Sequence, residues 1–125
     1  MNVVDSCGWL EYFADASNAD FFAPVIIDEA NLLVPSICIY EVFKRLVQQI
    51  GEESALQAMG MLYRGQVVDL DGEIALSAAR LSLEYRLPMA DSILLATARA
   101  HNATLWTQDG HFQNLPGVEY IHKQG

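Results

Sequence analysis

The chain begins with MNVVDSCGW (residues 1–9), in which a short apolar run at Asn2–Val4 leads directly into the carboxylate of Asp5. The run has the composition of a buried strand, and the residues from Ser6 onward predict a short helix. Asp5 therefore has two interpretations. It either caps the helix that follows or is held at the end of the strand for chemistry.

The same order of strand and then helix repeats along the chain. Apolar periodicity, glycines and prolines predict strands at Asn2–Val4, Leu32–Val34, Gln66–Val68, Thr104–Thr107 and Val118–Ile121. They predict helices at Ser6–Phe13, Ala19–Glu29 (with a kink or break at Pro24), from a cap at Ser36 to Gly51, Glu52–Arg64, Asp71–Tyr85 and Pro88–His101. This order predicts one α/β domain over residues 1–125, with three α/β/α layers around a central, mostly parallel sheet of four to five strands.

The composition fits a well-packed globular protein. Hydrophobic residues make up 52% of the 125 positions, enough for a substantial core. Apolar runs fall well short of the ~20 residues that span a bilayer, so we expect no membrane association. The N-terminus lacks the basic segment of a secretory signal. We therefore expect a cytoplasmic protein in which Cys7 and Cys38 are free thiols.

Acidic residues outnumber basic ones by 16 to 7, which gives a net charge of −9. This balance argues against broad nucleic-acid binding, because phosphates need cations to neutralise them. It suits a metal-binding chain or one with a basic partner. It equally suits a chain that uses surface acids for solubility.

Four acids fall where predicted strands end or the next helices begin. They are Asp5 after the first strand, Glu41 in the helix after the second strand, Asp91 in the first turn of the helix that begins near Pro88, and Asp109 after the Thr104–Thr107 strand. Ligands of parallel sheets bind outside the carboxyl ends of the strands. We therefore expect these four side chains to share one cleft.

Three of these acids also have local explanations. Glu41 lies opposite the main apolar stripe of its helix, beside Lys44 and Arg45, where a surface ion pair would account for it. Asp91 suits a helix N-terminus, but the residues three, four and seven positions later are apolar, so its carboxylate heads a buried stripe. Asp109 begins an Asp-Gly pair that is common in turns.

Together, the four acids indicate a metal site. Carboxylates that converge on one cleft repel one another and cannot all stay ionised without cations between them. Ligands that are all oxygen select hard cations, chiefly Mg²⁺ or Mn²⁺. Thr107, two residues before Asp109, is placed to hydrogen-bond a neighbouring carboxylate.

Two other patterns are weaker. Asp69 and Asp71 resemble the strand-DxDG start of haloacid-dehalogenase-like phosphatases, but only Lys123 follows where that chemistry needs a downstream Lys. We interpret these two acids as a strand end and a helix cap. His111, two residues after Asp109, is close enough to visit the site but is interpreted as a surface loop residue.

Four segments, in this order, resemble a known family: VVDSCGWLEYF with Asp5, SICIYEVFKRL with Glu41, LPMADSILLATA with Asp91, and LWTQDGHF with Thr107 and Asp109. The chain resembles a PIN-domain nuclease, specifically a VapC-type toxin of a toxin–antitoxin pair. The resemblance covers essentially the whole chain. The sequence departs from the family at Cys7, where many relatives carry Ser or Asn, and a thiol is a poorer hydrogen-bond partner.

The resemblance implies a Mg²⁺- or Mn²⁺-dependent endoribonuclease of single-stranded RNA, in which the metal activates water to hydrolyse RNA phosphodiester bonds. The implied metal-binding and catalytic residues are Asp5, Glu41, Asp91 and Asp109, with Asp5 and Asp91 as the direct ligands and Thr107 and Ser6 as supporting polar groups.

The resemblance further implies a cognate antitoxin, a homodimer and a larger toxin–antitoxin complex. An inhibitory antitoxin segment would carry Arg or Lys into the cleft. Lys44 and Arg45, close to Glu41, are the candidates for contact with RNA, although pairing with surface acids explains them equally well.

Two other functions stay open. A receiver-like phosphoacceptor domain would share the length, the α/β alternation and the Mg²⁺-binding acids. It would need paired acids after the first strand and a Lys after a late strand, whereas Asp5 is followed by Ser6 and Lys123 lies beyond the last strand. A catalytically inactive PIN domain would act only as a binding module, and four intact acids argue against it.

Overall fold

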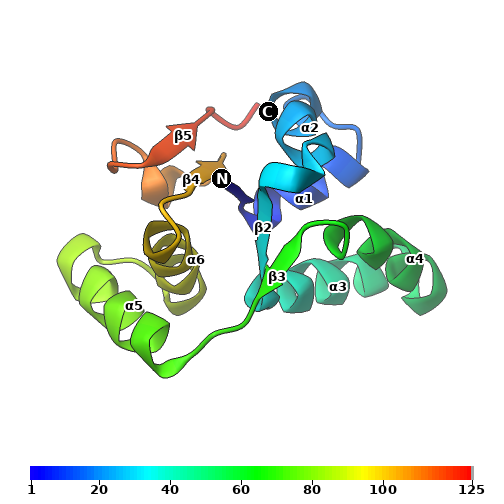
Figure 1. Ribbon diagram of the computed structural model, residues 1–125. Helices are drawn as coiled ribbons and strands as arrows, with labels where there is room; N and C mark the ends of the chain where they lie inside the picture. The colour runs from blue at the N-terminus through cyan, green and yellow to red at the C-terminus, as the bar shows by residue number, and fades with distance from the viewer. Residues whose placement is uncertain (125) are drawn as a thin grey trace.

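The computed structural model describes residues 1–124 and contains a five-stranded sheet in the order β3-β2-β1-β4-β5 (Figure 1). Its strands are β1 (Asn2–Val4), β2 (Leu32–Pro35), β3 (Gln66–Val68), β4 (Thr104–Thr107) and β5 (Val118–Tyr120). Each pair of neighbouring strands is parallel. The predicted sheet is therefore confirmed, and β1, the strand that precedes Asp5, lies at its centre.

Helices cover both faces of the sheet (Figure 1). They are α1 (Ser6–Phe13), α2 (Ala19–Ile27), α3 (Ser36–Ile50), α4 (Glu52–Leu62), α5 (Gly72–Tyr85) and α6 (Met89–Ala100), with short 3₁₀ helices η1 (Glu29–Asn31) and η2 (Gly110–Phe112). Helices α1 to α4 form the core on one face, and α6 packs on the other face with α5 outside it. Within residues 1–124, each helix is too short or too polar to cross a membrane.

Alternation along the strands produces the two cores. Val3 and Leu33 pack on the α6 side of the sheet, whereas Val4, Leu32 and Val34 pack among α1 to α4. Because successive strand residues point to opposite faces, a strand that is apolar at every position must be covered on both sides. The short apolar runs of the sequence therefore produce the three-layer fold.

The boundaries differ from the predictions at several helix ends. Helix α2 continues through Pro24 and ends at Ile27, because Asp28 leaves the helical conformation (φ −83°, ψ 69°) before η1 begins. The predicted cap at Ser36 is wrong: Pro35 occupies that position, and Ser36 is already the first residue of α3. Asp71 does cap α5, since its carboxylate accepts a hydrogen bond from the backbone N–H of Ile74 at 2.9 Å.

Gly8 lies where α1 approaches α2 and the central strand. A Cβ at this position would lie 2.6 Å from Cε1 of Phe22 and 2.8 Å from Cγ1 of Val4, and both of these side chains are fully buried. We expect Gly8→Ala to lower the free energy of unfolding by about 1–3 kcal/mol through overpacking, as measured by denaturant titration. Gly60→Ala in α4 is the matched control, because a Cβ there meets no described atom within 4 Å; it should stabilise the protein by roughly 0.5–1 kcal/mol. A Gly8→Ala protein as stable as the wild type would contradict this packing.

Candidate active site

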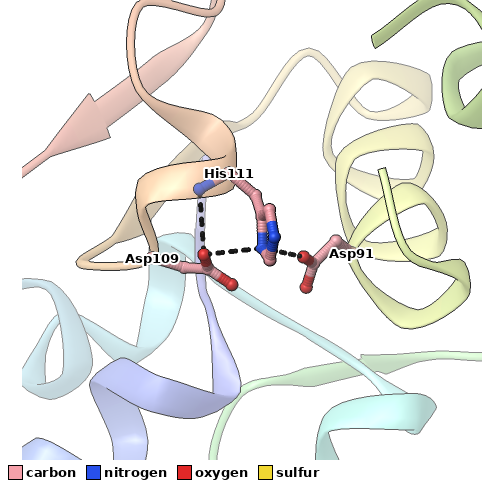
Figure 2. Close-up of side chains that lie close together, drawn as sticks. All are labelled: Asp91, Asp109 and His111. Carbon is pink, nitrogen blue, oxygen red and sulfur yellow. Dashed lines mark hydrogen bonds and ion pairs between the residues drawn. The ribbon is translucent and has the colours of Figure 1, made fainter. Parts of the chain in front are cut away.

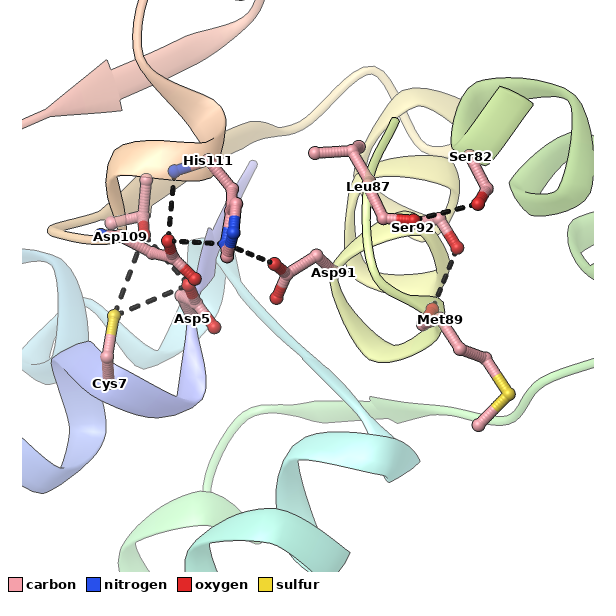
Figure 3. Close-up of polar contacts among 10 residues, drawn as sticks. Asp5, Cys7, Ser82, Leu87, Met89, Asp91, Ser92, Asp109 and His111 are labelled. Carbon is pink, nitrogen blue, oxygen red and sulfur yellow. Dashed lines mark hydrogen bonds and ion pairs between the residues drawn. The ribbon is translucent and has the colours of Figure 1, made fainter. Parts of the chain in front are cut away.

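The four predicted acids converge at the carboxyl end of the sheet. Asp5 follows β1 and Asp109 follows β4, which are neighbouring strands, while Asp91 lies in the first turn of α6 and Glu41 lies in α3. Figure 3 shows Asp5, Asp91 and Asp109 facing one space. The charges of Asp109 and Glu41 raise the pKa values of both Asp5 and Asp91, so all four are close enough to interact.

Asp5 is almost completely buried, with 4% of its surface exposed. Its Oδ2 accepts hydrogen bonds from Oγ1 of Thr107 at 2.8 Å and from the Cys7 thiol at 3.3 Å. Asp5 occupies the N-cap position of α1, as the capping interpretation expected, but its carboxylate makes no capping bond to the described residues of the helix. Burial, with smaller contributions from the charges of Asp109 and Glu41, raises the pKa of Asp5 to about 6 despite these two hydrogen bonds.

Thr107 connects two of the acids. Besides donating to Asp5, its fully buried hydroxyl accepts a hydrogen bond from the backbone N–H of Asp109 at 2.9 Å. The predicted hydrogen bond from Thr107 to a neighbouring carboxylate is confirmed. One hydroxyl thus fixes the positions of the strand-end carboxylate and of the loop that carries Asp109.

Glu41 accepts a hydrogen bond from Oγ of Ser6 at 2.7 Å. Among residues 1–124 it forms no ion pair with Lys44 or Arg45, so the predicted surface pairing is not what holds it. The ammonium of Lys44 lies instead 3.5 Å from the hydroxyl of Tyr40. Glu41 is therefore oriented toward the cleft by the helix that follows β1.

Asp91 heads the buried face of α6, as its spacing predicted. Leu94, Leu95 and Ala98 are all at most 1% exposed, and 15% of the Asp91 side chain is exposed. Burial and the charge of Asp109 raise its pKa to about 7, with smaller contributions from Asp5 and Glu41 and an opposing one from His111. A nearby cation would favour the anionic form of a carboxylate in these surroundings.

His111 lies between two of the acids, which corrects its interpretation as a surface loop residue. Its Nδ1 is 2.9 Å from Oδ1 of Asp109 and 3.2 Å from Oδ2 of Asp91 (Figure 2), although 57% of its side chain is exposed. The hydrogen bond to Asp109 raises the pKa of His111. Asp109 also accepts a hydrogen bond from the backbone N–H of His111 at 2.9 Å, so the predicted turn role of Asp109 holds as well.

The donor set fits a divalent cation. One ligand atom each from Asp91, Asp109 and His111 lie within 4.8 Å of one another, and Asp5 and Glu41 lie close enough to perturb the same group. This set differs from the predicted one because it includes an imidazole, which suits transition metals such as Zn²⁺ and Fe²⁺, beside carboxylates, which suit Mg²⁺ and Mn²⁺. Burial is the main cause of the raised pKa values of Asp5 and Asp91, and the neighbouring carboxylates add to it; a bound cation would offset both effects.

A buried amide network behind the site was missed from the sequence. Gln108 accepts a hydrogen bond from the Asn18 amide and donates one to Glu11, each at 3.0 Å, and Glu11 also accepts one from the backbone N–H of Asn18 at 2.9 Å. Asn18 and Gln108 are at most 5% exposed. This network joins α1 and α2 to the end of β4, and no local pattern in the sequence predicts it.

Comparison with known proteins adds a family and a set of related folds. The family model of the PIN domain matches residues 3–118. No curated protein sequence shows significant similarity to the chain. Among solved structures, a toxin–antitoxin complex from Klebsiella pneumoniae has 22% identity and a TM-score of 0.79, with coverage of 95% of this chain and 96% of that one.

Two further structures share the fold. VapBC2 from Rickettsia felis, bound to a DNA fragment from its promoter, is 15% identical, has a TM-score of 0.74 and is aligned over 97% of each chain. VapC20 from Mycobacterium tuberculosis, a sarcin–ricin loop cleaving toxin, is 14% identical, has a TM-score of 0.73 and is aligned over 90% of this chain and 92% of that one. The PIN match runs from β1 to the start of β5 and includes all four acids of the cleft. The chain therefore belongs to the PIN domain family.

Proposed function

We propose that the protein is a metal-dependent endoribonuclease, the toxin component of a VapBC-type toxin–antitoxin pair that acts in the cytoplasm. The observation that supports this most directly is the convergence of four carboxylates in one cleft, two of them with strongly raised pKa values. Structural stability does not require such an arrangement, because each buried charge makes folding less favourable. Hydrolysis assisted by a divalent cation does require it.

The chain's own residues would hold and orient the reacting groups. Asp5 and Asp91 are the proposed direct ligands, with Glu41 and Asp109 binding the metal directly or through water. When bound, Mg²⁺ or Mn²⁺ would supply the Lewis acidity that activates water and stabilises charge on the phosphate.

Supporting polar groups would fix the geometry. Thr107 holds one oxygen of Asp5 at 2.8 Å, and Ser6 holds one oxygen of Glu41 at 2.7 Å. We propose that these hydroxyls leave the other carboxylate oxygens directed into the cleft. A positioned carboxylate loses less rotamer freedom on binding its ligand.

We further propose that a cognate antitoxin inhibits the enzyme and that the toxin forms a homodimer within a larger complex. The acidic cleft and the net charge of −9 would attract an antitoxin segment that carries Arg or Lys. Such a cation would occupy the place of the metal among the carboxylates. The relatives solved as toxin–antitoxin complexes support this partner.

Membership of the PIN family argues against the receiver-like alternative. A catalytically inactive PIN domain would share both fold and acids, so turnover is the property that separates the two remaining functions.

The test is to incubate the purified protein with total cellular RNA in Mg²⁺ or Mn²⁺ and, in parallel, with a chelator, and to map new 5′ ends. We expect cleavage that the chelator abolishes, because phosphate cannot approach the uncompensated carboxylates. Asp91→Asn should lose cleavage, while Asp69→Asn, outside the cleft, keeps it. Cleavage in the chelator, or cleavage undiminished by Asp91→Asn, would rule out the mechanism.

A further inference from the structure

Two open grooves meet beside the acidic cleft. The first has a volume of about 350 Å³, lies between α1 and α3, and is lined by residues that include Glu41, Tyr40, Lys44 and Arg45. The second has a volume of about 450 Å³ and lies between the loop after β4 and the residues after β5; its lining includes Asp109, Tyr120, His122 and Lys123. Cys7 lines both grooves, and its thiol contacts Asp5. The buried acid therefore lies next to the junction.

The grooves hold a large share of the chain's few cations. Of seven Lys and Arg residues, three line the grooves, namely Lys44, Arg45 and Lys123. Within residues 1–124 none of these three forms an ion pair, although the hydrogen bond from the Asn18 backbone and, more weakly, the charge of Lys123 lower the pKa of Glu11. Arg80, Arg86 and Arg99 form none in this range either, so it is the position of the three groove cations that matters. In a chain of net charge −9, cations on both sides of an acidic cleft suit a polyanionic ligand that crosses it.

Each groove also has a tyrosine beside its basic residues. Tyr40 is 62% exposed, and the Lys44 ammonium lies 3.5 Å from its hydroxyl and 5.6 Å from its ring centre, toward the hydroxyl end of the ring. In the second groove, the Tyr120 hydroxyl lies 3.5 Å from Nδ1 of His122. Aromatic rings for bases together with cations for phosphates are what proteins use to bind single-stranded nucleic acid.

We propose that single-stranded RNA crosses the site from one groove to the other. Its phosphates contact Lys44 and Arg45 on one side of the acids and Lys123 on the other, and its bases lie against Tyr40 and Tyr120. The phosphodiester at the junction then lies beside Asp5. This inference rests on the proposed nuclease function and adds the path of the substrate and the residues that contact it on each side of the acids.

The test measures binding of a fluorescein-labelled single-stranded RNA by anisotropy over a series of salt concentrations. All proteins carry Asp91→Asn so that the RNA stays intact. For single strands, each phosphate contact contributes about 0.7 to the slope of log K against log salt. We expect Lys44→Ala and Lys123→Ala each to reduce the slope by about 0.7, and the double variant by about 1.4. Arg80→Ala, an exposed cation on α5, removes the same charge and should leave the slope unchanged.

Stacking is tested separately in the same background. Tyr40→Ala should weaken RNA binding about tenfold, and Tyr40→Phe, which keeps the ring, should not. Equal losses for both variants would show that the hydroxyl rather than the ring makes the contact, and would overturn the stacking part of the path.

The outcomes separate this path from the nuclease function itself. If wild-type protein cleaves RNA but Lys123→Ala behaves like Arg80→Ala, the second groove carries no RNA and the inference is wrong. If the slopes change as expected but the wild type cleaves no RNA with either metal, the path stands and the nuclease proposal fails. If the lysine variants lose affinity for a labelled oligoglutamate peptide while their RNA slopes stay unchanged, the grooves bind an acidic protein and the RNA path is overturned.

Discussion

Asp5→Asn is expected to abolish RNA cleavage and, in the absence of metal, to raise the melting temperature of the protein. The amide keeps an oxygen that can accept the Thr107 hydrogen bond at 2.8 Å, and it removes a negative charge from a site that is 4% exposed. Because the pKa of Asp5 is raised from 3.8 to about 6, its ionised carboxylate makes folding about 3 kcal/mol less favourable at neutral pH than a carboxylate with an unshifted pKa would. Asn avoids that cost.

The two effects of this substitution have different sizes. Residues that merely orient metal ligands contribute about 10–100-fold, so loss of a direct ligand should lower cleavage by at least about 100-fold. Removing the buried charge should stabilise the metal-free protein by about 1–3 kcal/mol, or about 4–11 °C in melting temperature. Cleavage is measured with labelled RNA, and stability by thermal melts in chelator.

Asp71→Asn is the matched control for Asp5→Asn. Asp71 caps α5 through Ile74, and Asn caps helices about as well as Asp. Its cleavage and melting temperature should therefore stay close to those of the wild type. A fall of several degrees for Asp5→Asn would mean that the Asp5 carboxylate stabilises the fold, which is the opposite of what its burial implies.

The fold followed from the sequence because its signals are local. Val3 and Val4 are apolar at successive positions, and this requires cover on both faces of β1. Once β1 and β4 are neighbours in a parallel sheet, Asp5 and Asp109 must lie at the same edge. Glu41 and Asp91 were placed by their positions near the start of helices, since Glu41 lies in the second turn of α3, which follows β2, and Asp91 lies in the first turn of α6.

The parts of the site that were missed depend on side-chain directions that no local pattern encodes. His111 reaches Asp91 because the 3₁₀ turn after Asp109 directs its ring back toward α6. Gln108 and Asn18 meet across 90 residues of sequence, and each amide is ordinary in its own segment. Ser36 has the composition of a cap, but β2 runs directly into α3, so Pro35 takes that position.

The metal-free protein is expected to lose stability as the pH rises from 5 to 8. The folded-state pKa values of Asp5 and Asp91 are about 6 and about 7, both above the value of 3.8 that each carboxyl has when unfolded. Between the unfolded-state and the folded-state pKa values, the folded state binds more protons than the unfolded state, so the free energy of unfolding falls with increasing pH. The raised pKa of His111 acts in the same direction, although its exposed ring makes its effect small.

The expected loss between pH 5 and 8 is about 2–4 kcal/mol, given 1.36 kcal/mol per pKa unit. It is measured by urea titration in chelator at a series of pH values. Asp5→Asn should reduce the slope up to about pH 6 and Asp91→Asn should reduce it up to about pH 7, because each group contributes between its unfolded and its folded pKa. Asp71→Asn should leave the profile unchanged.

Adding Mn²⁺ should reverse the pH dependence of the free energy of unfolding. A cation that binds only the folded state stabilises it by RT ln(1 + [L]/Kd), and binding tightens as the carboxylates lose their protons. The gain in stability should therefore grow from pH 5 to pH 8 in the wild type and shrink in Asp91→Asn. Stability that rises with pH in chelator, or a Mn²⁺ effect equal at both pH values, would show that these carboxylates are not held protonated by crowding, and the argument for a cation site in this cleft would lose its physical basis.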